Sequence, residues 1–127
     1  MGAQESDCIT ILVVEDECLL RCEIVEHLVE AGFRVLEADS AEAALAFAGN
    51  GHQIDLVFTD IRLGGHLNGW DVGEGFRAAF PEMPIIYTSG LSISPAREVA
   101  GSVFFDKPYN PAGIISACRT LTASPYG

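Results

Sequence analysis

The most constraining feature of this sequence is a short apolar run that ends in an acid. Leu56, Val57 and Phe58 are followed by Thr59 and then by Asp60. A short apolar run between polar residues predicts a strand buried on both faces, which is typical of parallel sheets. A carboxylate just past such a strand would lie at the carboxyl edge of the sheet, where open α/β sheets bind ligands.

Four further apolar segments alternate with helical patterns along the chain. Strands are expected at about 9–14, 33–38, 84–88 and 103–105, in addition to the one that ends at Asp60. Helices are expected at about 18–31, 39–48, 70–80, 95–100 and 110–121, from apolar spacing and from residues that open helices. Five strands alternating with five helices, the fourth helix short, predict an α/β fold with a doubly wound parallel sheet.

The length and the apolar content fit one domain. The chain has 127 residues, of which 49% are hydrophobic, enough for a substantial core. We expect a single domain over residues 1–127, with its folded core at about 9–121 and no second, output domain in the chain. The polar start lacks a signal-peptide pattern, and no apolar run approaches the ~20 residues of a membrane span. We therefore expect a soluble, cytoplasmic protein.

Charge and cysteine content exclude several function classes. Seven basic residues against eighteen acidic ones give a net charge of −11, which repels nucleic-acid backbones and anionic membranes, so we expect neither as a partner. The four cysteines form no C-x-x-C pair, and we expect reduced thiols. Two of them, Cys18 and Cys22, share one face of a predicted helix, which suits packing. The other two are Cys8 and Cys118.

Polar residues recur where the predicted strands end. Glu15 and Asp16 follow the first strand, Asp60 the third, Ser89 the fourth and Lys107 the fifth. Three clustered carboxylates repel one another and favour a bound cation, and oxygen ligands suit Mg²⁺. A lysine and a hydroxyl beside such a site would stabilise a phosphoryl group. The sequence has no glycine-rich nucleotide loop, whereas a carboxylate can itself be the nucleophile of an aspartyl phosphate.

Taken together and in order, these motifs resemble the receiver domain of two-component response regulators, of the stand-alone type. The matching pieces extend over nearly the whole chain, from about Ile9 to Leu121. The resemblance implies a flavodoxin-like fold with the strand order 2-1-3-4-5. The pieces are VEDE at 14–17, TD at 59–60, PIIYTSG at 84–90 and FFDKPY at 104–109.

The resemblance also implies a role for each site residue. Asp60 would accept a phosphoryl group from a phosphohistidine of a sensor histidine kinase or a phosphotransfer protein. Glu15 and Asp16 would hold Mg²⁺ together with Asp60 and the backbone carbonyl of Arg62. Lys107 would pair with the phosphoryl oxygens, across a cis bond to the following proline.

Two further residues would carry the signal outward. The resemblance gives Ser89 the place of the switch hydroxyl and Phe104 that of the switch aromatic. Signalling would run through protein–protein contacts in a phosphorelay, with a kinase, a phosphotransfer protein or a second copy of the chain as partner. Such a domain is not a conventional enzyme, although it phosphorylates and dephosphorylates itself with Mg²⁺.

The sequence departs from the family pattern in two places, and two other functions stay open. Residues 63–65 read LGG, with one extra residue before Asn68 and Gly69, and the stretch between Ser89 and Lys107 is short. A haloacid-dehalogenase-type phosphohydrolase would use similar groups, but it carries a second acid where this chain has Arg62. A receiver that only binds partners would have lost a key residue, and all of them are present.

Overall fold

The computed structural model describes residues 8–90 and 97–123, and it contains one five-stranded sheet. All strand pairs are parallel, and the order is β2-β1-β3-β4-β5. The predicted sheet and strand order are therefore confirmed. The strands are β1 (Thr10–Val14), β2 (Arg34–Ala38), β3 (Leu56–Asp60), β4 (Ile85–Ser89) and β5 (Val103–Asp106).

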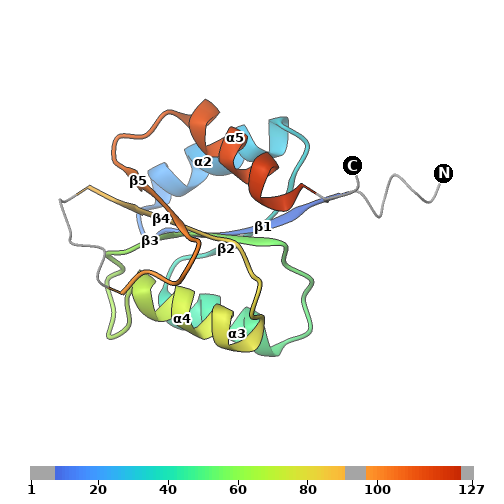
Figure 1. The fold of residues 1–127 in the computed structure, drawn as a ribbon. Coiled ribbons are helices and arrows are strands. Elements are labelled where there is room, and N and C mark those ends of the chain that lie inside the picture. The colour runs from blue at the N-terminus through green and yellow to red at the C-terminus, as the bar shows by residue number, and fades with distance from the viewer. Residues whose placement is uncertain (1–7, 91–96, 124–127) are drawn as a thin grey trace.

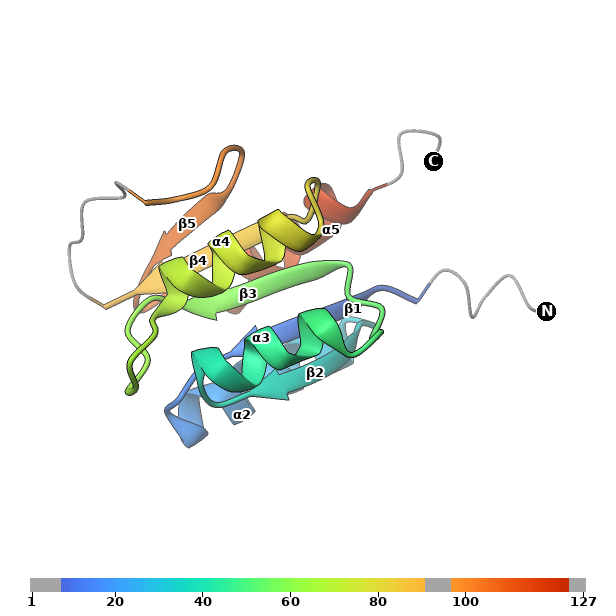
Figure 2. The same cartoon turned by 90° about the horizontal axis from the view of Figure 1, so that it is seen from below.

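Helices cover both faces of the sheet. Figure 1 shows α2 (Cys18–Glu30) and α5 (Pro111–Thr122) on one face, and α3 (Ala41–Gly49) and α4 (Gly69–Ala79) on the other. Seen from below in Figure 2, α3 and α4 run side by side across the sheet. This arrangement brings the carboxyl ends of all five strands to one edge, since parallel strands all point the same way.

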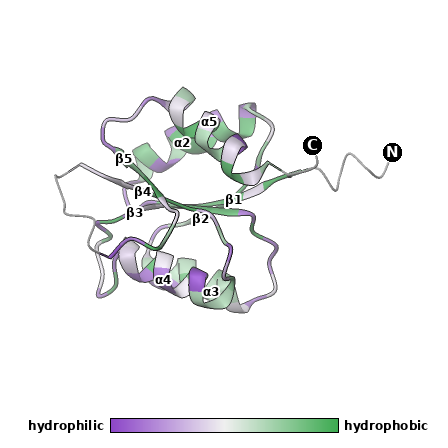
Figure 3. Ribbon diagram, viewed as in Figure 1, coloured by the Kyte–Doolittle hydropathy of each residue, from purple (hydrophilic) through white to green (hydrophobic). Residues whose placement is uncertain are grey.

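The core consists of two apolar layers, one on each side of the sheet. The inner strands β1, β3 and β4 are buried along their whole length, and the middle of the sheet is largely hydrophobic in Figure 3, as expected for strands covered on both faces. The outer strands β2 and β5 are partly exposed. Leu12, Val57 and Tyr87 belong to the layer under α3 and α4, while Phe58 and Ile86 belong to the layer under α2 and α5. Within the described residues, no helix is long and apolar enough to cross a membrane.

Polar side chains fix where three helices begin. The Ser40 hydroxyl accepts a hydrogen bond from the backbone N–H of Ala43 at the start of α3. Asn68 and Asp71 form a reciprocal capping box at the start of α4. Asn110 caps α5 from the position before Pro111. Each cap satisfies a backbone N–H that the helix itself leaves without a partner.

The prediction of five helices is wrong, because the described residues contain four. Residues 97–102, which we call the strap, are not helical, and the first two residues of the helix predicted at 95–100 lie outside the described residues. Side chains of the rest of the protein hold the strap instead. Arg77 donates to the Ala100 carbonyl at 2.8 Å, and the Tyr87 hydroxyl accepts from the Val99 N–H at 3.4 Å. These contacts replace helical hydrogen bonds, which a segment this short could not sustain.

The expectation that Cys18 and Cys22 pack into the core is also wrong. Both side chains are exposed, because the buried residues of α2, Ile24 and Leu28, lie on a different face of the helix. Cys118 is buried in the core, together with Ile114 of the same helix, α5.

Candidate functional site

A lysine joins two buried carboxylates at the carboxyl edge of the sheet. The Lys107 ammonium lies 2.9 Å from Glu15 Oε1 and 2.9 Å from Asp60 Oδ2. The side chains of Glu15 and Asp60 are only 4% and 7% exposed, and that of Lys107 is 17% exposed. The strand ends of β1 and β3 and the turn after β5 therefore meet in one charged cluster.

Asp16 completes a set of three acids. Oxygen atoms of Glu15, Asp16 and Asp60 all lie within 4.8 Å of one another, and Asp16 is the exposed member. Backbone N–H groups orient the buried pair: Glu17 donates to Glu15 Oε2 at 3.1 Å, and Arg62 donates to Asp60 Oδ1 at 3.3 Å. The set offers hard oxygen donors with one side open to solvent, a chemistry that suits Mg²⁺.

The electrostatics of the cluster follow from burial and pairing. Burial raises the pKa of the Glu15 carboxyl above its usual value, and the nearby charge of Asp60 adds to this against the lowering effect of Lys107. Burial alone would lower the pKa of Lys107, but its hydrogen bonds to Asp60 and Glu15 outweigh burial and raise it. Lys107 therefore stays a cation at neutral pH, placed to meet further negative charge.

The loop after Asp60 packs closely against β3 at Gly69. A Cβ atom at Gly69 would overlap the carbonyl oxygen of Asp60, so the start of α4 can approach β3 this closely only without a side chain. The Gly69 N–H donates to the Ile61 carbonyl at 2.8 Å. Nearer the loop tip, a Cβ at Gly64 would lie 3.3 Å from Asp16 Oδ2. The loop with the unusual LGG sequence thus lies directly against the acidic cluster.

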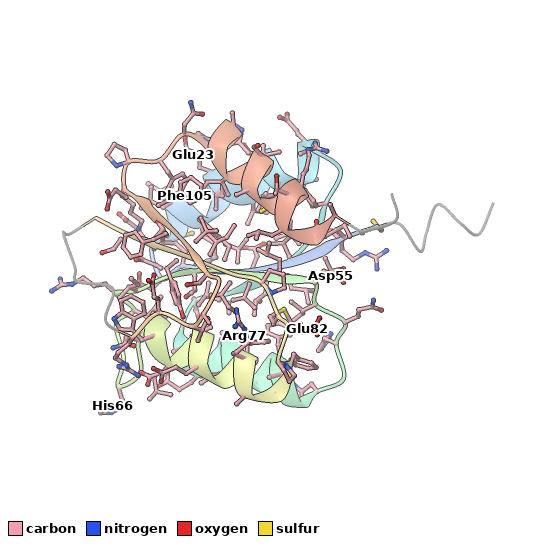
Figure 4. The ribbon with its side chains drawn as sticks, in the orientation of Figure 1. Glu23, Asp55, His66, Arg77, Glu82 and Phe105 are labelled. Carbon is pink, nitrogen blue, oxygen red and sulfur yellow. The ribbon has the colours of Figure 1, made fainter. Side chains whose placement is uncertain are left out.

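Ser89 and Phe104 lie on neighbouring strands beside the cluster. Ser89 is buried, pairs in register with Asp106, and its carbonyl accepts the Lys107 N–H at 2.8 Å. Phe104 is half-buried and packs on the α3–α4 side, whereas Phe105 lies on the α5 side, as Figure 4 shows. The Lys107–Pro108 bond is cis, as predicted. Ser89 is thus next to the lysine, while Phe104 is at the edge of the sheet.

Sequence reasoning missed one residue that supports the cluster from outside. Arg21 donates from Nη1 to the Glu15 carbonyl at 2.9 Å and from Nε to Glu37 Oε1 at 3.1 Å. It thereby ties the acidic turn after β1 to the end of β2. Its position on α2 carries no motif, and only the parallel pairing of β1 with β2 would have indicated the contact.

An apolar groove borders Lys107 on the α2 side. The volume of the groove is about 430 Å³. Leu19, which precedes the lining residue Leu20 in α2, is 81% exposed. The ring of Tyr109, one of the lining residues, contacts Phe58 edge-on, with centroids 5.7 Å apart. The lining residues are Leu20, Glu23, Ile24, Lys107, Pro108, Tyr109 and Pro111.

Comparison with known proteins gives a consistent family. Residues 11–119 match the family model of the response regulator receiver domain. The transcriptional regulatory protein CusR of Escherichia coli K12 is 33% identical over 115 residues, which cover 87% of this chain and 50% of that protein. AruR of Pseudomonas aeruginosa is 32% identical, over 87% of this chain and 48% of that protein. The chain thus spans about half the length of these curated relatives.

Solved structures agree with the sequence matches. A response regulator receiver protein from Sinorhizobium medicae superposes with a TM-score of 0.89 at 33% identity, covering 93% of this chain and 97% of that one. The receiver domain of NtrX from Brucella abortus superposes with a TM-score of 0.76 at 32% identity, over 90% of this chain and 99% of that one. Family model, relatives and fold agree, and the chain belongs to the receiver domains of two-component response regulators rather than to a conventional enzyme family.

Proposed function

We propose that Asp60 accepts a phosphoryl group from a phosphohistidine and that the chain then signals through protein contacts. The observation that carries this proposal is the placement of the Asp60 carboxylate. One oxygen lies 2.9 Å from the Lys107 ammonium, and the other accepts the Arg62 N–H. A carboxylate held in this way is oriented as a nucleophile and has a cation beside it for the charge that arrives.

The transfer forms one bond and breaks one. A carboxylate oxygen of Asp60 attacks phosphorus, the phosphorus–nitrogen bond to the histidine ring breaks, and the ring nitrogen keeps the electron pair and takes up a proton. Lys107 offsets the charge on the phosphoryl oxygens, and Ser89, at the next strand end, donates a hydroxyl hydrogen bond to one of them. The position of Ser89 is supported by its carbonyl, which accepts the Lys107 N–H.

The donor set fits Mg²⁺. Glu15, Asp16 and Asp60 would hold the ion, together with the backbone carbonyl of Arg62, because their oxygens converge within 4.8 Å and Asp16 faces solvent. When bound, the ion supplies positive charge that neutralises phosphoryl oxygens during transfer. Arg21 and the Glu17 N–H keep the acidic turn in place for this role.

The groove beside Lys107 is the proposed docking place for the phosphohistidine donor. It is lined mainly by apolar side chains of α2 and of the segment after Lys107, with Glu23 and Lys107 as its charged members. Leu19, which precedes the lining residue Leu20 in α2, is exposed. An amphipathic helix of a histidine kinase or phosphotransfer protein could lay its apolar face there and present its histidine to Asp60. The strongly acidic surface favours a partner with a basic rim.

The outgoing signal is proposed to leave by β4 and β5. Ser89 would report the phosphoryl group, and Phe104, in register with Tyr87 on the neighbouring strand, would respond at the sheet edge. Because Tyr87 also holds Val99 of the strap, a shift at Ser89 would reach the strap as well. The receiving partner would be another protein or a second copy of this chain.

Incubation with Mg²⁺ and acetyl phosphate, followed by intact-mass measurement, tests the proposed acceptor. We expect one added phosphoryl group on the wild-type chain and none on Asp60→Asn. Asp39→Asn, which changes an exposed aspartate outside the cluster, should be modified at the wild-type rate. An adduct on Asp60→Asn, or free phosphate released with no adduct on the wild type, would contradict the assignment, the second by indicating a phosphohydrolase.

A further inference from the structure

Two exposed cysteines lie one helical turn apart on α2, outside the site described above. Cys18 and Cys22 are both exposed, while Cys8 is half-buried and Cys118 is buried. Cys18 and Cys22 are four residues apart in α2, so their side chains lie on the same face of the helix. The buried residues of α2, Ile24 and Leu28, lie on a different face, so packing gives no reason for a cysteine at either position. The pair therefore presents two sulfur ligands to solvent at one point.

The spacing of the pair excludes a disulfide in an intact helix. Residues four apart on a helix have Cβ atoms about 5–6 Å apart, whereas a disulfide needs about 3.5–4.5 Å. Two sulfurs on one helical turn can instead bind the same third atom, because metal–sulfur bonds of about 2.3 Å each span the gap. The helix geometry thus selects a bridging atom over a direct sulfur–sulfur bond.

The residues around Cys18 and Cys22 favour a thiophilic ion that needs few ligands. Among the described residues, the only group of three or more His, Cys, Asp or Glu side chains with converging ligand atoms is Glu15, Asp16 and Asp60. Cys18 and Cys22 thus have no third ligand of these types, which disfavours the four-coordinate geometry of structural zinc. Both thiols are open to solvent and share one helical turn, so one centre can reach both sulfurs without moving the backbone. Thiolates select thiophilic ions.

We propose that Cys18 and Cys22 form a dithiol site for a thiophilic metal or metalloid centre of low coordination number, such as trivalent arsenic. With phenylarsine oxide as the probe, the arsenic–oxygen bond breaks and two arsenic–sulfur bonds form. The two thiol protons leave with the oxygen as one water molecule, and no atom changes its oxidation state. The site is independent of the proposed chemistry at Asp60.

Intact-mass measurement of the full chain with phenylarsine oxide, in an excess of a monothiol, tests the site. The wild type should hold one arsenical through the monothiol challenge, since the second sulfur binds intramolecularly. The variants Cys18→Ser and Cys22→Ser should bind about 10²-fold more weakly. Cys8→Ser, which removes a thiol elsewhere, should bind like the wild type. Far-UV circular dichroism should be unchanged on binding, because the bridge fits a helical turn.

Three results would overturn the proposal. The first is no retained adduct on the wild type. The second is equal retention by Cys22→Ser or Cys18→Ser, which would place the arsenical on other thiols. The third is a loss of helical signal when the arsenical binds, which would show that the two sulfurs reach one centre only after α2 unwinds. Circular dichroism of the free variants establishes that each one is folded, so that weak binding is assigned to the missing sulfur.

Discussion

The Tyr87 hydroxyl lies so close to Gly73 that no side chain fits between them: a Cβ atom at position 73 would overlap the hydroxyl oxygen. Tyr87 is fully buried in β4, and its ring centroid is 4.7 Å from that of Trp70. The same hydroxyl accepts the Val99 N–H of the strap. One tyrosine therefore joins α4, β4 and the strap, and only a glycine on α4 permits it.

Gly73→Ala should lower the free energy of unfolding by about 1–3 kcal/mol, because the new methyl group displaces a buried ring. Gly49→Ala is the matched control in α3, where a Cβ would meet no atom within 4 Å. That change should be neutral or stabilising by up to about 1 kcal/mol, since alanine favours helix. Urea unfolding measures both, and equal effects of the two changes would show that Gly73 is not required by Tyr87.

The sheet and the charged cluster could be predicted from the sequence for a physical reason. Strands buried on both faces must be continuously apolar, so a polar residue such as Asp60 or Ser89 marks the end of one. Parallel strands then bring those ends to one edge, which is why Glu15, Asp60 and Lys107 meet as predicted.

The strap and the cysteine face could not be predicted in this way. The sequence predicts a short helix at about 95–100, but whether residues 97–102 become helical depends on Arg77 and Tyr87, which are distant in sequence. Likewise, helical spacing shows that Cys18 and Cys22 share a face, but not which face the sheet covers. Both errors arise because local pattern carries no information on tertiary partners.

Two buried threonines should respond in opposite ways to replacement by valine. Thr88 Oγ1 has no hydrogen-bond partner among the described residues, so Thr88→Val removes an unsatisfied hydroxyl and should stabilise the fold by about 1 kcal/mol. Thr59 Oγ1 donates to the Asp60 carbonyl at 2.8 Å, so Thr59→Val should destabilise by about the same amount. Thermal or urea unfolding compares them, and destabilisation by Thr88→Val would mean that its hydroxyl has a partner in solution.

The phenol of Tyr109 should contribute to unfolding at alkaline pH. Burial raises its pKa to about 12 in the folded chain, against about 10 when unfolded. The folded state then holds the proton where the unfolded state has lost it, so this contribution is complete below about pH 10 and disappears as the pH rises through about 12. Tyr109→Phe keeps the ring contact with Phe58 and should lose less stability across that window. If the free energy of unfolding fell equally with pH in the wild type and in Tyr109→Phe, the raised pKa of Tyr109 would be refuted.

Lys107→Met should be the most destabilising of these changes at neutral pH. It leaves Glu15 and Asp60 buried without their cation, and breaking a buried pair typically costs about 3–5 kcal/mol. Arg97→Met is the control, because Arg97 is 43% exposed in its pairs with Asp71 and Glu74 and should cost at most about 1 kcal/mol. Without the lowering effect of Lys107 the pKa of the buried Glu15 carboxyl rises further, so this variant should regain stability relative to wild type as the pH falls. Adding Glu15→Gln to Lys107→Met should recover part of the loss at neutral pH, because one buried charge is removed. If the loss of unfolding free energy in the double variant equalled the sum of the losses in Lys107→Met and Glu15→Gln, Lys107 and Glu15 would not be energetically coupled.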